Sequence, residues 1–104
     1  MLGRVKHFLL IYEAVDDYVV KRAPYRAEHL ALCRASAERG ELRYGGAYAD
    51  PADGAVLAFR GADRGVAERF AAADPYVRNG LITRFTVREW TVVVGADYTG
   101  PPPD

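Results

Sequence analysis

One segment near the start of the chain is apolar on both faces of the strand that it predicts. Val5–Tyr12 is rich in β-branched, aromatic and aliphatic residues, and the polar Glu13 follows it, which is typical of a β-strand. Successive side chains of a strand point to opposite faces, and here both sets are largely apolar. A strand of this kind is normally covered on both sides. We therefore expect other parts of the fold, or of a partner, to cover both faces of this strand.

Helical and strand-like patterns alternate along the rest of the chain. Pro24 divides the first helical stretch, and Gly40 ends it after a basic last turn. The order β-α-β-β-α-β predicts a ferredoxin-like α+β fold, in which a four-stranded antiparallel sheet carries both helices on one face. The predicted elements are strands 5–12, 42–48, 55–59 and 82–94 and helices 16–22, 24–39, 63–73 and 74–79.

Length and charge exclude several classes of protein. The 104 residues fit one domain, and half of them are hydrophobic, which excludes a disordered chain. The 14 Lys and Arg residues balance 14 Asp and Glu residues without forming a basic stripe, which argues against nucleic acid as a partner. Residues 1–96 are predicted to form the domain, and residues 97–104 a proline-rich tail that cannot continue a β-ladder.

The cysteine content and the N-terminus predict the compartment. Cys33 is the single cysteine, so no internal disulfide can form, and no Cys/His cluster predicts a zinc site. The apolar residues after His7 are too few for a signal peptide or a membrane span. We therefore expect a soluble, cytoplasmic protein with no membrane partner. No metal, nucleotide or flavin signature predicts a cofactor.

The two faces of the sheet predict a homodimer. Both helices cover one face, which leaves Trp90 and a row of side chains from the first strand exposed in a monomer. Exposed apolar patches of that size usually mark an interface or a ligand groove. We expect two copies to pack through the face opposite the helices, through residues of the fourth strand and Phe8, Leu10 or Tyr12.

His29 is the most informative side chain for chemistry. It lies on the apolar side of the predicted 24–39 helix, one turn after Arg26 and one turn before Cys33. One interpretation is a core histidine bonded to a backbone carbonyl; the other is a general base or acid, because histidine exchanges protons near neutral pH. A histidine and an arginine on a buried face need an acidic partner or an anionic ligand to offset their desolvation.

Asp74 could supply that partner. Asp before Pro is a standard N-cap, and the same carboxylate could orient an imidazole as in catalytic triads. Spacing along the chain does not show that Asp74 and His29 meet. Cys33 has no base beside it in the sequence and is predicted to be an inert buried thiol. The aromatic residues that could line a pocket, or simply belong to the core, are Tyr12, Tyr48, Tyr76 and Trp90.

Several short motifs together resemble the YciI-like, or YCII-related, domain family. They are Arg26-Ala27-Glu28-His29-Leu30, Gly40-Glu41-Leu42 with Gly46, Ala73-Asp74-Pro75-Tyr76-Val77 and Gly80-Leu81, in this order. The resemblance runs from the first strand to Val94. It implies a ferredoxin-like α+β fold that dimerises sheet to sheet, as a dimeric α/β barrel. It also implies a His–Asp site, which falls on His29 and Asp74 with Arg26 alongside.

Three functions are consistent with these residues. The first is a small hydrolase- or lyase-like enzyme, in which His29 and Asp74 perform acid–base chemistry on a small polar or aromatic molecule. The second is a non-catalytic domain that binds a small ligand, and the third, by analogy of fold alone, is a cofactor-free oxygenase of the dimeric barrel type. A hydrogen bond between His29 and Asp74 beside an accessible cavity favours the first. The predicted substrate-binding residues are Arg26, Tyr12, Tyr76 and Trp90.

Overall fold

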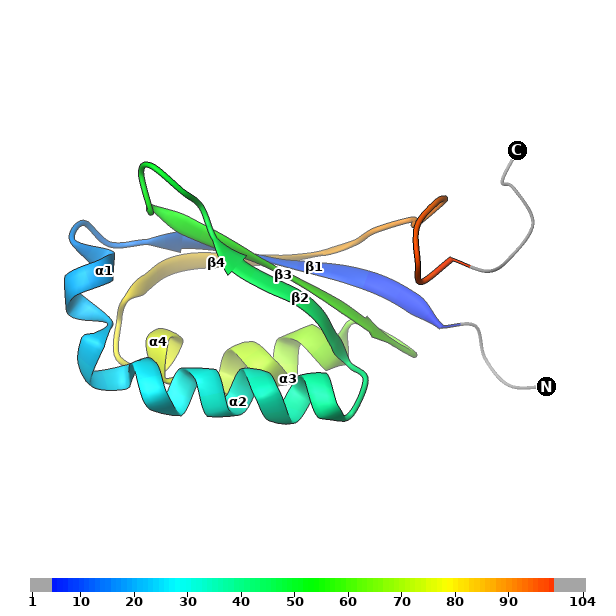
Figure 1. Cartoon of the computed structure of the whole chain (residues 1–104), viewed down its shortest axis with the longest axis horizontal. Helices are drawn as coiled ribbons and strands as arrows, with labels where there is room; N and C mark the ends of the chain where they lie inside the picture. Colours follow the sequence, from blue (N-terminus) through cyan, green and yellow to red (C-terminus); the bar gives the residue numbers. More distant parts are fainter. Residues whose placement is uncertain (1–4, 99–104) are drawn as a thin grey trace.

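Four antiparallel strands form one sheet in the order β2-β3-β1-β4 in the computed structural model, which describes residues 5–98 (Figure 1). Helices α2, α3 and α4 all lie on one side of this sheet (Figure 1). The predicted ferredoxin-like α+β fold is confirmed. The strands are β1 (Lys6–Ala14), β2 (Leu42–Ala47), β3 (Gly54–Gly61) and β4 (Ile82–Glu89), and the helices are α1 (Tyr18–Lys21), η1 (Ala23–Tyr25), α2 (Arg26–Glu38), α3 (Gly65–Ala73) and α4 (Pro75–Arg78).

The helix-covered face of the sheet holds the hydrophobic core. Phe8, Leu10 and Tyr12 of β1 point to this face and are at most 3% exposed. β1 lies between β3 and β4, so each of these side chains has a paired residue on both sides. Burying a large apolar side chain contributes roughly 1.5–3 kcal/mol to stability. The buried residues of α3 close the core from the helix side: Val66, Ala67, Phe70 and Ala71.

Local signals explain where the helices begin and end. α2 begins at Arg26, two residues later than predicted, because Pro24 lies in the 3₁₀ turn η1. Gly40, with a φ of +79°, follows the end of α2 in the left-handed conformation that glycine favours. Asp63 Oδ1 accepts a hydrogen bond of 2.8 Å from the backbone N–H of Gly65, where α3 begins. None of the helices within residues 5–98 is long and apolar enough to cross a membrane.

β4 is shorter than its sequence pattern predicts. The pattern extends to Val94, but the strand ends at Glu89. β4 is an edge strand, and within the described sheet its one neighbour is β1. Glu89 already pairs with Phe8, close to the start of β1, and Trp90 adds one last bond of 2.8 Å from its N–H to the carbonyl of His7. The ladder therefore stops where β1 begins, because β4 has no further partner strand beyond that point within the described sheet.

The three β1 residues predicted for the dimer interface lie on the face that the helices cover. Phe8, Leu10 and Tyr12 are buried under the helices and cannot contact a second copy through the opposite face. That opposite side, here called the open face, carries the alternate residues of β1 and the residues paired with them on β3. Trp90 follows β4 on the same side and is 48% exposed. The apolar residues of the open face include Leu9, Ile11, Val56, Ala58 and Trp90.

An ion pair ties the start of the predicted 97–104 tail to the sheet. The guanidinium of Arg43 donates two hydrogen bonds to the carboxylate of Asp97, of 2.9 and 2.8 Å. Arg43 belongs to β2, which is the edge of the sheet opposite β4. Residues 99–104 lie outside the described residues, and the boundary at residue 96 stays a prediction.

Candidate active site

A buried carboxylate lies where the last two helices meet. Asp74 separates α3 from α4 and is 0% exposed. Its Oδ1 accepts a hydrogen bond of 3.0 Å from the backbone N–H of Tyr76 and so caps α4, as Asp before Pro predicts. A buried charge is strongly destabilising unless hydrogen bonds replace the water that it has lost. Asp74 therefore needs further donors, and two other elements supply them.

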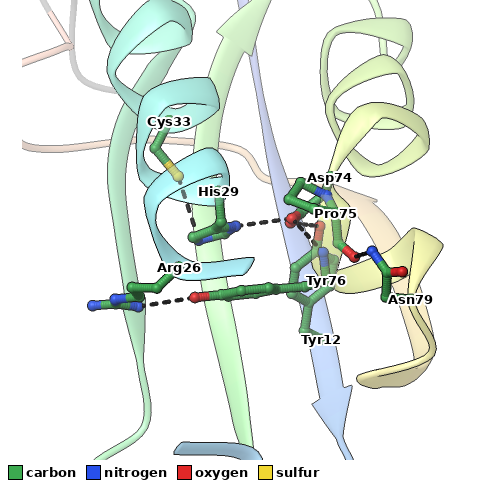
Figure 2. A network of polar contacts seen from close by, with 8 residues as sticks. All are labelled: Tyr12, Arg26, His29, Cys33, Asp74, Pro75, Tyr76 and Asn79. Atoms are coloured by element: carbon green, nitrogen blue, oxygen red, sulfur yellow. Dashed lines mark hydrogen bonds and ion pairs between the residues drawn. The ribbon is translucent and has the colours of Figure 1, made fainter. Parts of the chain in front are cut away.

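Tyr12 and His29 are those donors. The Tyr12 hydroxyl on β1 donates to Asp74 Oδ2 at 2.7 Å, and His29 Nδ1 on α2 lies 2.9 Å from Oδ1 (Figure 2). A carboxylate can only accept, so His29 donates its Nδ1–H, which leaves Nε2 on the other side of the ring as an acceptor that can take a proton. The fold thus brings together two residues whose proximity the sequence could not show.

Aromatic side chains fix the plane of the His29 ring. The Tyr76 ring stacks on the imidazole, with centroids 3.9 Å apart and an angle of 10° between the planes (Figure 2). Phe70 contacts the imidazole edge-on at a centroid distance of 6.4 Å. Tyr76 is itself fully buried, and its hydroxyl accepts a hydrogen bond of 3.3 Å from Arg26 Nη1. These contacts determine the direction in which Nε2 points.

A cavity of about 240 Å³ lies beside His29. α2 and β1 form part of its wall, and the Gly45-Gly46 stretch of β2 contributes a wall without side chains. Cys33 also lines the cavity, and its Sγ lies 3.5 Å from His29 Nε2 (Figure 2). The other lining residues include Tyr12, Tyr18, Arg22, Arg26, Leu30, Leu42 and Leu57.

The cavity carries positive charge. Arg22 and Arg26 lie on its wall, and no Asp or Glu from the described part of the chain does. The hydrogen bond to Tyr76 raises the pKa of Arg26, so its guanidinium stays charged. Arg22 lies over the ring of Tyr18, 5.1 Å from the centroid, which is a cation–π contact. The cavity is therefore suited to a ligand with oxygen atoms that are anionic or partly so.

Five of the six predicted site residues form one cluster, and the sixth does not join it. Trp90 lies on the open face and does not line the cavity. It lies across the sheet from α2, which carries His29, and from the junction of α3 and α4, which carries Asp74. The clustered residues are Tyr12, Arg26, His29, Asp74 and Tyr76 (Figure 2).

Two further residues line the cavity that were not among the predicted site residues, Cys33 and Arg22. Cys33 has no basic neighbour in the sequence, but one helical turn brings it against His29. Arg22 precedes Arg26 by four residues, and both reach the same cavity. The absence of a base next to Cys33 in the sequence therefore does not keep a base away from it in the fold, and its inertness stays a prediction.

A second cavity is larger but lacks acid–base groups. It measures about 440 Å³, and its charged lining residues are Arg39, Arg43 and Arg60. Two of these are already paired, with Glu41 and Asp97. No histidine, cysteine or carboxylate of the described residues lines it, so the smaller cavity is the candidate site. Nor do three or more His, Cys, Asp or Glu side chains gather to hold a metal ion anywhere in the described chain.

Removing the Tyr12 hydroxyl should destabilise the protein, because Asp74 Oδ2 would lose its donor. We expect Tyr12→Phe to lower the free energy of unfolding at pH 7 by about 1.5–3 kcal/mol, the range for hydrogen bonds to charged groups. Tyr44→Phe, at an exposed position of β2, is the control and should change it by less than about 0.5 kcal/mol. Urea unfolding measures both values.

The same variant has an alkaline signature. Burial, and then the Asp74 charge, raise the pKa of Tyr12 in the folded protein above its ordinary value of 10.0. Unfolded tyrosine therefore ionises first, so the stability from protonated Tyr12 is complete below pH 10 and is lost as the pH rises above it. Wild-type protein should lose stability above pH 10 more steeply than Tyr12→Phe does. If the stability of both proteins fell equally with pH, the pKa of Tyr12 would not be raised in the folded protein, which would contradict its hydrogen bond to the Asp74 carboxylate.

Comparison with solved structures supports the fold. The 5-chloro-2-hydroxyhydroquinone dehydrochlorinase TftG from Burkholderia phenoliruptrix AC1100, solved in complex with 2,5-dihydroxybenzoquinone, superposes with a TM-score of 0.70 at 19% identity, over 82% of this chain and 93% of that one. Rv0793 from Mycobacterium tuberculosis superposes with a TM-score of 0.53 at 18% identity, over 90% of this chain and 100% of that one. At these identities the likeness concerns the fold alone.

Comparison with family models is more specific. The model of the YCII-related domain matches residues 5–91, which include all four strands and both members of the His29–Asp74 pair. A comparison with curated proteins gave no match. Because the family model covers most of the sequence, the chain belongs to the YCII-related domain family.

Proposed function

We propose that this chain is a small-molecule enzyme in which His29 and Asp74 perform general acid–base catalysis. The observation that carries the proposal is the 2.9 Å hydrogen bond from His29 Nδ1 to Asp74, beside a cavity that His29 lines. A base that a buried carboxylate orients, and whose second nitrogen carries no hydrogen, recurs in enzymes that transfer protons. A histidine that only filled space would not need a carboxylate on one side and a cavity on the other.

In the proposed mechanism, His29 Nε2 takes a proton from a bound substrate, and the Asp74 carboxylate stabilises the imidazolium that forms. Two further donors to Asp74, the Tyr12 hydroxyl and the Tyr76 N–H, keep it in place as an acceptor. His29 then returns the proton to the leaving group or to the product. Proton transfer of this kind supports hydrolase- or lyase-like chemistry and contributes roughly 10²–10⁴-fold in rate.

The proposed substrate is a small molecule with a polar or aromatic ring. The cavity, at about 240 Å³, is below the range of roughly 300–1,000 Å³ that is typical of pockets for drug-sized ligands. Arg22 and Arg26 can bind its oxygen atoms, and Tyr18 can contact the ring. The dehydrochlorinase of similar fold was solved with 2,5-dihydroxybenzoquinone, a molecule of this class. We therefore propose hydroxylated single-ring compounds as the first to test.

A binding measurement comes first. We expect 2,5-dihydroxybenzoquinone, as the probe of this class, to raise the melting temperature of the wild-type protein, because a ligand of the folded state stabilises it. The shift should shrink for Arg26→Gln and should persist for Glu28→Gln, whose exposed side chain does not line the cavity. An unchanged melting temperature with this and other hydroxylated rings at millimolar concentration would contradict the proposed class.

Turnover then separates catalysis from binding. On any compound of this panel that is converted, His29→Gln should lower kcat/KM by at least about 100-fold, while Glu28→Gln leaves it unchanged. Asp74→Asn should lower it as well, although asparagine caps a helix nearly as well as aspartate. Ring absorbance, which changes as a compound is converted, is the measurement. Binding without conversion would favour the second candidate, a non-catalytic ligand-binding domain, which Arg22 and Arg26 on the cavity wall also support.

We also propose that two copies pack through their open faces. Leu9 and Ile11 of the central strand are only partly covered in the single chain, and Trp90 is half exposed beside them. A second open face would cover these side chains and bury on the order of 1,600 Å² in total.

Light scattering at micromolar concentration tests this assembly. Wild-type protein should have the mass of a dimer, and Ile11→Arg the mass of a monomer, because a charge would then lie in the apolar contact. Val20→Arg, at a 74% exposed position of α1, is the control and should remain a dimer. A monomeric wild-type protein would overturn the proposal.

A further inference from the structure

Three side chains of the site form a chain of hydrogen bonds that ends on a thiol. Asp74 Oδ1 lies 2.9 Å from His29 Nδ1, and His29 Nε2 lies 3.5 Å from Cys33 Sγ (Figure 2). The order carboxylate, imidazole, thiol is the arrangement of an orienting group, a base and a nucleophile. His29 and Cys33 lie one turn apart on α2, so the helix itself holds the thiol against the base.

The thiol can be reached from the cavity. Cys33 is partly exposed and lines the cavity wall, whereas Asp74 is fully buried behind the imidazole. A ligand in the cavity therefore meets Sγ and Nε2 together and does not touch the carboxylate. This placement differs from that of an inert core cysteine, which would face other apolar side chains on all sides.

The resting thiol needs a base in order to react. Burial raises the pKa of Cys33 to about 11, and the Asp74 charge acts in the same direction, while Arg26 and Arg34 oppose it. Cys33 is therefore a neutral thiol at pH 7, and a thiolate is the form that attacks carbon. Its proton has an acceptor 3.5 Å away in His29 Nε2. Attack on a ligand can thus be coupled to transfer of the thiol proton to His29.

We propose that Cys33 is a nucleophile of this site, activated by His29 and directed at small carbon electrophiles of the conjugated carbonyl class. The inference rests on the proposed function of the His29–Asp74 pair. Arg22 and Arg26, on the same wall, can stabilise the carbonyl oxygen of such a ligand, and Leu30 and Leu57 can contact its apolar part. None of the three functions considered from the sequence included a covalent step.

The step is an addition in which no electrons are gained or lost overall. The S–H bond of Cys33 breaks, its proton passes to His29 Nε2, and the sulfur pair forms a C–S bond at the β-carbon of the ligand. The pair of the C=C bond forms a new double bond between the α-carbon and the carbonyl carbon, and the pair of the C=O bond moves onto the oxygen, which gives an enolate beside Arg22 or Arg26. His29 then gives its proton to the α-carbon, so that S–H has added across the double bond. No oxidant, reductant or further reactant is needed.

The single cysteine makes the test direct, because a thiol reagent can report only Cys33. N-ethylmaleimide, a conjugated carbonyl compound, would be added to the native protein, and the rate of its addition measured by intact mass at pH 7.5. We expect the wild-type protein and Glu28→Gln to react at least about tenfold faster than His29→Gln, which lacks the base. Asp74→Asn should also slow the reaction, because the imidazole is no longer oriented.

Partial unfolding would change these rates in the opposite direction. A variant that opens the structure exposes the thiol and reacts faster, so a slower reaction cannot come from loss of fold. Rates in urea, where all variants are unfolded, should be equal and serve as the reference. Equal native rates for wild type, His29→Gln and Asp74→Asn would overturn the proposal, as would a wild-type thiol that reacts only in urea.

This measurement is independent of turnover. If Cys33 addition does not depend on His29 but His29→Gln still abolishes conversion of a substrate, the nucleophile is refuted and the acid–base function stands. If His29 accelerates addition to Cys33 but no hydroxylated ring is bound or converted, the proposed substrate class fails and the activated thiol stands.

Discussion

The buried carboxylate of Asp74 is the constraint on which the rest of the site depends. A charge without access to water is stable in a protein only when hydrogen bonds replace its hydration. Three donors do so here, and they come from β1, α2 and α4. Asp74 thus joins the sheet layer to the helix layer at one point. Loss of any one donor leaves the buried carboxylate with an unmade hydrogen bond, which destabilises the fold. The stability of the protein therefore depends jointly on Asp74 and on each of its donors.

The hydrogen bonds that stabilise Asp74 also prepare His29 for chemistry. Because the carboxylate accepts a hydrogen bond from Nδ1–H, the unprotonated Nε2 lies on the cavity side beside Cys33, and the stacked Tyr76 ring prevents the imidazole from turning. Tyr76 lies in the first turn of α4, the helix that Asp74 caps. One short local structure therefore supplies the orienting charge and the surface on which the base rests. Stability and reactivity of this site have a common physical origin.

Local signals in the sequence predict the elements and the two members of the pair, because caps, glycine stops and helical faces depend on neighbouring residues. They do not predict that His29 and Asp74 touch, since 45 residues separate them and the sheet brings them together. Local signals also led to the wrong prediction that Leu10 lies on the face opposite the helices. Both faces of β1 are apolar, so the alternation of side chains does not say which face the helices cover. For Cys33, the sequence gives the one-turn spacing to His29, but only the structure shows that the thiol and the imidazole meet at 3.5 Å. The length of β4 depends on its neighbouring strand.

The position of one proton tests the central claim most directly. The chain has two histidines, so long-range ¹H–¹⁵N NMR spectra of histidine-labelled protein contain two ring systems, and His29→Gln identifies the signals of His29. At a pH where this imidazole is neutral, a carboxylate that orients it requires the proton on Nδ1 and a bare Nε2. The account predicts that tautomer. A neutral ring with its proton on Nε2 would mean that Asp74 does not orient His29, and would contradict the account.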